Sequence, residues 1–137
     1  MNVGSLLVNS AHKYPERLAI ISDEGRWTYK EFDQRTSQLA GAMLNAGLKK
    51  GDRVAILFFN SSYFVEVYFA TLKAGLVAIP VNFRFVGPEI VYVLNDSQPC
   101  LLFYGSEFDQ TLLEIREQLE TIRIFVSPHN GSSSLAI

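Results

Sequence analysis

One stretch, residues 72–82, limits the possible folds more than any other, because it joins the end of a helix directly to a short apolar strand. Lys73 and Ala74 suit a last helical turn, and Gly75 can adopt the left-handed conformation that ends a helix. Residues 76–81 form a run apolar enough to be buried on both faces, as in a parallel sheet. The junction therefore predicts an α/β fold.

Apolar runs alternate with helical patterns along the rest of the chain. Strands are expected at residues 18–22, 26–28, 54–59, 76–81, 100–104 and 122–126, and helices at residues 5–14, 28–46, 63–74, 88–96 and 108–120. The run 54–59 lacks polar alternation and predicts a central strand. Strands and helices at this spacing imply right-handed crossovers. The expected fold is a three-layer α/β unit with a mainly parallel open sheet flanked by helices.

The helix from residue 28 has the clearest start. Thr28 and Glu31 have the spacing of a capping box, in which each side chain binds a free backbone amide of the other residue. Helical spacing predicts a buried face made of Phe32, Thr36, Leu39, Ala40, Met43 and Ala46. The opposite, water-facing side is expected to carry Asp33, Gln34, Gln38 and Asn45.

Two other helices differ in how much polar surface they show. Helix 63–74 has little polar face beyond Glu66 and Lys73, and Ser61 before it is expected to be its cap. The last helix is expected to bury one apolar face, formed by Phe108, Leu112, Leu113 and Leu119. Its acidic side is interpreted as a solvated surface.

Composition sets the broad class. The 137 residues are 48% hydrophobic with a net charge of −2 and scattered cations, which indicates a globular domain with neither a nucleic-acid footprint nor a basic membrane patch. Cys100 is the single cysteine, no run approaches the roughly 20 apolar residues of a membrane span, and no signal peptide is recognisable. We therefore expect a cytoplasmic protein with a folded unit at residues 1–126 and a flexible tail at residues 127–137.

The best candidates for ligand contact follow the strand 76–81, because ligands of an open parallel sheet gather outside the carboxyl ends of its strands. Arg84 offers a guanidinium that suits a phosphate. Asn82 is the weaker candidate, since a short amide readily bonds to nearby main chain. His12 is expected on a helix surface and His129 in the tail, so no metal site is predicted.

Four ordered segments resemble the amino-terminal portion of the adenylate-forming (AMP-binding) superfamily. They are residues 27–32, residues 51–56, Asn60 with Ser61 before a helix, and residues 72–82 with Arg84. The resemblance is strongest to acyl- and aryl-CoA ligases, of the long-chain fatty-acid–CoA ligase type. Amino-acid adenylating domains of the superfamily often have Asp where this chain has Asn82.

The resemblance implies that a complete enzyme converts a carboxylate and ATP into an acyl-adenylate, with Mg²⁺ assisting, and then transfers the acyl group to CoA. In some CoA ligases the arginine corresponding to Arg84 lies near the phosphates of the CoA nucleotide. Asn82 is a weaker candidate for the same site.

This sequence lacks the family's Gly-rich Ser/Thr segment followed by Pro-Lys-Gly, its later adenine and ribose segments, and its carboxyl-terminal lysine. We therefore expect an amino-terminal fragment that by itself has no catalytic residue, no metal site, no bound cofactor and no turnover. Its expected partner is the remainder of the ligase, which carries the ATP-binding and C-terminal domains.

Two alternatives come from other classes of protein. One is a stand-alone α/β binding or oligomerisation domain derived from this fold, and the other is a receiver-like regulatory domain suggested by Asp23 and Glu24. The receiver alternative is weakened because the expected central strands end at Phe59 and Val81, and neither is followed by aspartate. Exposed apolar surface on helix 63–74 is expected to cause self-association.

Overall fold

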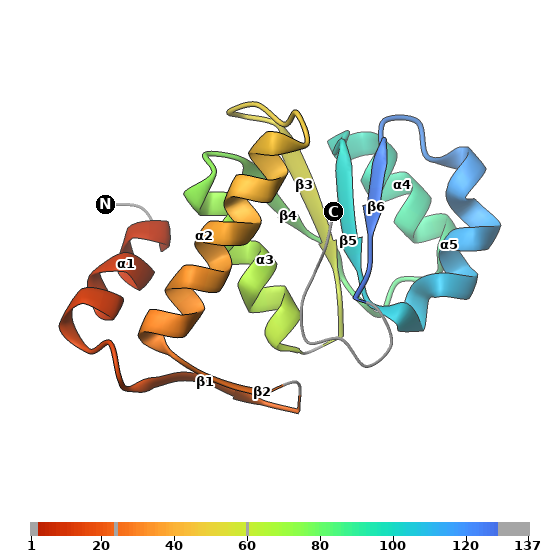
Figure 1. Cartoon of the computed structure of the whole chain (residues 1–137). Helices are drawn as coiled ribbons and strands as arrows, with labels where there is room; N and C mark the ends of the chain where they lie inside the picture. Colours follow the sequence, from red (N-terminus) through yellow and green to blue (C-terminus); the bar gives the residue numbers. More distant parts are fainter. Residues whose placement is uncertain (1–2, 24, 60, 129–137) are drawn as a thin grey trace.

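Two separate sheets organise the computed structural model, which describes residues 3–23, 25–59 and 61–128. The larger is a parallel sheet of four strands in the order β4-β3-β5-β6, and the smaller is the antiparallel pair β1-β2 (Figure 1). The elements are α1 Val3–Lys13, β1 Leu18–Ser22, β2 Gly25–Thr28, α2 Tyr29–Asn45, β3 Arg53–Leu57, α3 Ser62–Lys73, β4 Val77–Pro80, α4 Gly87–Ser97, β5 Leu101–Tyr104, α5 Asp109–Ile115 and β6 Ile124–Val126, with 3₁₀ turns η1 Ser106–Phe108 and η2 Arg116–Gln118 on either side of α5. The predicted α/β class with a mainly parallel sheet is confirmed.

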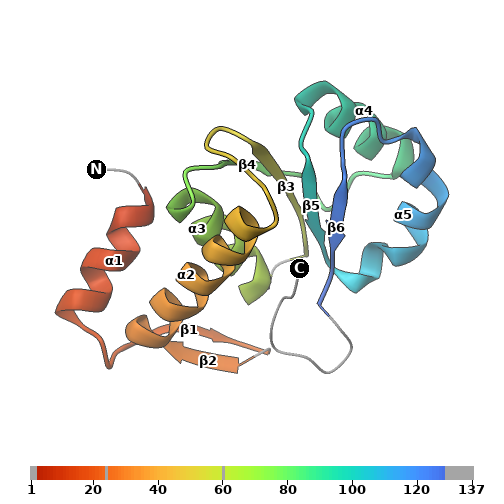
Figure 2. The ribbon, with the colours of Figure 1, turned by 45° about the horizontal axis from the view of Figure 1, so that its top comes forward.

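Helices cover both faces of the four-stranded sheet. On one face α2 and α3 contribute Met43 and Val67 to a buried cluster that also contains Ile56 of β3. On the other face α4 and α5 contribute Ile90 and Leu112 to a second cluster. Figure 2 shows the resulting three layers, with α1 packed outside α2 and away from the sheet.

Strand β4 lies at an edge of the sheet, and the predicted burial of residues 76–81 on both faces is wrong for it. Both ends of β4, Val77 and Pro80, are exposed. The backbone N–H of Val81 donates to the oxygen of Ile56 at 2.9 Å, so the preceding Pro80 turns its nitrogen away from β3. Proline has no N–H to donate, and an edge strand tolerates it there. The prediction that β3 is interior is confirmed.

The capping box at the start of α2 is present. Thr28 Oγ1 accepts from the N–H of Glu31 at 3.1 Å, and the N–H of Thr28 donates to Glu31 Oε1 at 2.9 Å. That backbone hydrogen bond lowers the pKa of Glu31. The predicted buried face is confirmed up to Met43, but Ala46 is exposed because the helix ends at Asn45 and Ala46 is its cap.

Side chains at four positions differ from expectation. Glu66 does not face water but is buried in α3, and Lys73 is only partly exposed. Ser61 lies at the cap position of α3, yet its side chain makes no capping hydrogen bond. Leu113 is 71% exposed, because the buried stripe runs through Phe108, Leu112 and Ile115, and Leu113 lies about 100° around the helix from Leu112.

Some predictions fall on residues that the structure does not describe. These are the roles of Glu24, Asn60 and His129, and the predicted tail from residue 129 onward. Within the described ranges, none of the large apolar side chains of α3 is exposed. The prediction that this helix exposes apolar surface is therefore wrong. No helix in those ranges is long and apolar enough to cross a bilayer.

Candidate functional site

The loop after β4 carries both predicted site residues. The N–H of Arg84 donates to Asn82 Oδ1 at 2.9 Å, and the N–H of Phe85 donates to the backbone oxygen of Asn82 at 3.1 Å. Asn82 therefore stabilises a turn by binding main chain, as expected of a short amide at this position. Arg84 is exposed, with its guanidinium carbon 5.5 Å from the centre of the Phe83 ring.

Three phenylalanine rings meet at the carboxyl ends of the parallel strands, and they come from the segments that follow β3, β4 and β5. The rings of Phe59 and Phe83 lie edge to face with centroids 5.2 Å apart, and those of Phe59 and Phe108 are stacked at 5.2 Å. Sequence reasoning missed this cluster. The signal was available, because each ring closely follows a strand of the parallel sheet and the carboxyl ends of such strands share one edge.

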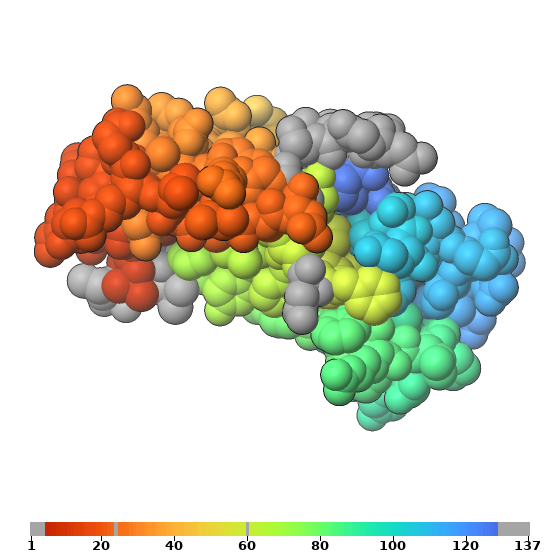
Figure 3. All heavy atoms as spheres, turned by 90° about the horizontal axis from the view of Figure 1, so that it is seen from below, coloured from red at the N-terminus to blue at the C-terminus, as the bar shows by residue number. Residues whose placement is uncertain are grey.

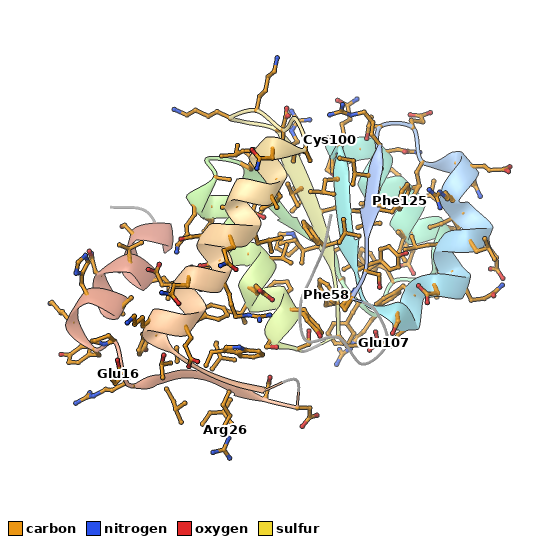
Figure 4. The ribbon with its side chains drawn as sticks, viewed as in Figure 1. Glu16, Arg26, Phe58, Cys100, Glu107 and Phe125 are labelled. Atoms are coloured by element: carbon orange, nitrogen blue, oxygen red, sulfur yellow. The ribbon has the colours of Figure 1, made fainter. Side chains whose placement is uncertain are left out.

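Gly105 brings the end of β5 close to β3. Its N–H donates to the oxygen of Leu57 at 3.0 Å, and it is buried. A Cβ at this position would lie 3.3 Å from Cδ1 of Phe58 and would collide with the carboxylate of Glu107. Figure 4 shows Phe58 and Glu107 together at this end of the sheet. Gly105 therefore lets the end of β5 pack closely beside Phe58.

The chemistry available here is anion binding. An open guanidinium beside aromatic rings can hold a phosphate in fork geometry. In the described part of the chain, no group of three or more His, Cys, Asp or Glu residues could hold a metal ion. The exposed guanidinium of Arg84 is therefore the cation that this loop presents to solvent.

Glu66 has a perturbed pKa, which often marks functional groups. Burial raises the pKa of Glu66, while Arg35, whose Nη2 lies 3.1 Å from Glu66 Oε1, acts in the opposite direction. The guanidinium of Arg35 also lies 4.6 Å from the centre of the Trp27 ring. These groups connect α2, α3 and β2, whereas Arg84 follows β4, so we interpret the pair as structural.

Comparison with known proteins decides the family. The family described as AMP-binding enzyme matches residues 7–135. This chain belongs to the AMP-binding enzyme family. The match runs past the predicted boundary at residue 126, and that boundary stays a prediction.

Relatives in the AMP-binding enzyme family include ligases for fatty acids. The fatty acid–[acyl-carrier-protein] ligase ScoC of Streptomyces coeruleorubidus is 37% identical over 98 residues, which are 72% of this chain and 19% of ScoC. The long-chain-fatty-acid–CoA ligase FadD13 of Mycobacterium tuberculosis is 32% identical over 121 residues, which are 87% of this chain and 24% of FadD13. The chain thus spans about a fifth to a quarter of the length of these curated relatives.

Solved structures agree with this assignment. The inhibitor-bound N-terminal domain of FACL13 from Mycobacterium tuberculosis matches 92% of this chain with a TM-score of 0.86 and 30% identity, and the match covers 33% of that domain's chain. The chain is homologous to the N-terminal domain of acyl-CoA ligases in the AMP-binding enzyme family. The predicted resemblance is therefore confirmed, and the receiver alternative is excluded.

Proposed function

We propose that this chain acts as the amino-terminal part of an AMP-forming acid–CoA ligase, in which it provides scaffold and one edge of the approach for CoA. The observation that carries the proposal is the turn after β4, where Asn82 fixes the backbone and leaves Arg84 open beside the Phe83 ring. Membership of the AMP-binding enzyme family makes CoA a fitting source of the phosphate.

The proposed division of work follows from what the sequence contains. Arg84 would hold a phosphate of the CoA nucleotide, and Asn82 would keep the loop in place for it. ATP and Mg²⁺ supply the activation step in a complete ligase, and we assign no residue of this chain to either. Binding a triphosphate requires a loop of backbone amides and positive charge, and no glycine-rich segment followed by Pro-Lys-Gly occurs in these 137 residues. We therefore propose that turnover depends on the remainder of the ligase.

The first prediction concerns turnover. The purified chain, incubated with ATP, Mg²⁺, CoA and a panel of fatty and aromatic acids, is expected to release no pyrophosphate above the acid-free blank. A complete ligase such as FadD13 of Mycobacterium tuberculosis serves as the positive control, because its name assigns it this activity. Acid-dependent pyrophosphate release by the chain alone would contradict the proposal.

The second prediction concerns CoA. We expect CoA at ten times its dissociation constant to stabilise the folded chain by about 1.4 kcal/mol in thermal unfolding, and ATP to have no such effect. Arg84→Ala should remove the CoA effect, because it deletes the guanidinium that binds the phosphate. Arg26→Ala is the matched control, since Arg26 is an exposed arginine on β2 and should keep the full shift.

Two outcomes would count against CoA recognition by Arg84. Equal stabilisation of wild type and Arg84→Ala by CoA would show that CoA binds at another part of the chain. No shift in wild type would favour the stand-alone binding or assembly domain. Dephospho-CoA, which lacks the 3′-phosphate, identifies the phosphate group: if Arg84 binds the 3′-phosphate, dephospho-CoA should stabilise wild type no more than it stabilises Arg84→Ala.

A further inference from the structure

We propose that Phe59 is a stacking platform for the adenine ring of the ligand whose phosphate Arg84 binds, so that this end of the sheet selects a nucleotide. The inference rests on the proposed function, because it takes CoA as the source of that phosphate. Phe59 is 41% exposed, whereas Phe58 before it is 5% exposed and packs in the core. A large ring therefore stays open to solvent just after the central strand β3, which ends at Leu57.

Two neighbouring rings hold Phe59 in place. Its ring stacks on that of Phe108 with centroids 5.2 Å apart and an interplanar angle of 29°, and the ring of Phe83 meets it at 66°. Phe108 is 6% exposed and belongs to the buried cluster that also contains Leu112. Because Phe59 has only two side-chain torsions and packs on a buried ring, stacking a ligand on it costs little additional side-chain entropy.

Phe83 lies between the Phe59 ring and the candidate cation. The centre of the Phe83 ring is 5.2 Å from the centre of the Phe59 ring and 5.5 Å from the guanidinium carbon of Arg84. The separation between Phe59 and Arg84 therefore cannot exceed the sum of these two distances. Figure 3, which looks onto this end of the sheet, shows yellow atoms after β3 at the surface beside green atoms after β4 and cyan atoms after β5. In a nucleotide a single ribose joins the base to the phosphate, so one ligand can reach both groups.

Stacking on an aromatic ring distinguishes a nucleotide from a phosphate compound that has no base. Every nucleobase has an aromatic face, and the strength of stacking depends little on which base is present. Arg84 supplies the complementary charge, because an exposed guanidinium binds phosphate oxygens in fork geometry. A phosphate compound without a base contacts Arg84 alone, so it binds this edge more weakly than the nucleotide part of CoA does.

Titration calorimetry with adenosine 3′,5′-bisphosphate, the nucleotide part of CoA, tests the platform. Phe59→Leu keeps an apolar side chain but removes the aromatic face, so it should weaken binding roughly tenfold. Phe59→Tyr keeps the ring and should bind as tightly as wild type. Tyr92→Leu is the matched control, because Tyr92 is an aromatic residue of α4 that is 72% exposed, and its affinity should equal that of wild type. Ribose 5-phosphate, which lacks a base, should bind wild type roughly tenfold or more weakly than the nucleotide does.

A tryptophan reporter gives a second readout that does not depend on how well Phe59→Leu folds. Phe59→Trp places an indole on the same platform, in a chain whose only native tryptophan is Trp27. Adenosine 3′,5′-bisphosphate should quench the added fluorescence, because the adenine ring stacks on the indole, and ribose 5-phosphate should not. Absence of quenching by the nucleotide would overturn the proposal.

The outcomes separate this inference from the proposed function. If Phe59→Leu binds the nucleotide as tightly as wild type and Arg84→Ala binds it more weakly, the stacking platform is wrong and the phosphate contact stands. If Phe59→Leu weakens binding and Arg84→Ala does not, the platform stands and the proposed role of Arg84 is wrong. A wild-type chain that binds neither CoA nor adenosine 3′,5′-bisphosphate contradicts both proposals.

Discussion

Replacing Glu66 by alanine is expected to lower the free energy of unfolding by about 3 kcal/mol, because it leaves the partly buried guanidinium of Arg35 without its carboxylate. Glu66 is 6% exposed, and its two carboxylate oxygens lie 3.1 and 3.2 Å from Arg35 Nη2. Removing one member of a buried ion pair costs far more than the pair contributes as a whole, since the remaining charge stays desolvated. Urea unfolding of the purified chain measures the effect.

Two further variants separate charge from packing. Glu117→Ala, which removes an exposed carboxylate, should change the free energy of unfolding by no more than about 0.5 kcal/mol. Glu66→Gln keeps the shape of the side chain and removes its titration. Equal stability of Glu66→Ala and wild type would show that the ion pair contributes nothing.

The raised pKa of Glu66 predicts a pH dependence with a definite sign. Because the folded state binds this proton more readily than the unfolded state, the contribution of Glu66 to stability is fully present below the ordinary value of 4.5 and is lost as pH rises through the raised pKa. Relative to Glu66→Gln, wild type should therefore gain stability as pH falls from 7 towards 4.5. A constant difference across this range would contradict the burial of Glu66.

The second large effect concerns neighbouring leucines of α5. Leu112→Ala should destabilise the fold by about 3 kcal/mol, because Leu112 is 4% exposed and belongs to the cluster between α5 and the sheet. Leu113→Ala should change stability by no more than about 0.5 kcal/mol, because Leu113 is 71% exposed. The same atoms are deleted one residue apart, so each variant is the control for the other. Similar losses for both would mean that α5 is rotated or longer than the structure shows.

Features that depend on local chemistry were predictable from the sequence. The capping box needs only Thr28 and Glu31 at the correct spacing, and both of its hydrogen bonds are present. The end of α3 needs only a residue tolerant of the left-handed region, and Gly75 has φ of 76°. Both features were identified correctly because no distant residue takes part in them.

Features that depend on distant neighbours were not predictable in the same way. Glu66 resembles a solvent-facing residue until α2 brings Arg35 within 3.1 Å of it. The edge position of β4 follows from strand order, which an apolar run does not encode.

The candidate site also combines features that are local in sequence with features that depend on distant residues. Arg84 and Asn82 could be selected because they follow one strand, and the bond from Arg84 N–H to Asn82 matches the expected use of the amide. The cluster of Phe59, Phe83 and Phe108 comes from three loops and requires the sheet to be assembled first. The CoA contact of Arg84 stays a prediction.

The strand order has a consequence for where a ligand can enter. From β3 the chain crosses first to β4 on one side and then back past β3 to β5 on the other, so α3 and α4 leave on opposite faces of the sheet. In a doubly wound sheet, ligands bind where the winding reverses, which here is between the carboxyl ends of β3 and β5. Here the stacked rings of Phe59 and Phe108 occupy that position. A ligand bound at this reversal point therefore meets two aromatic rings.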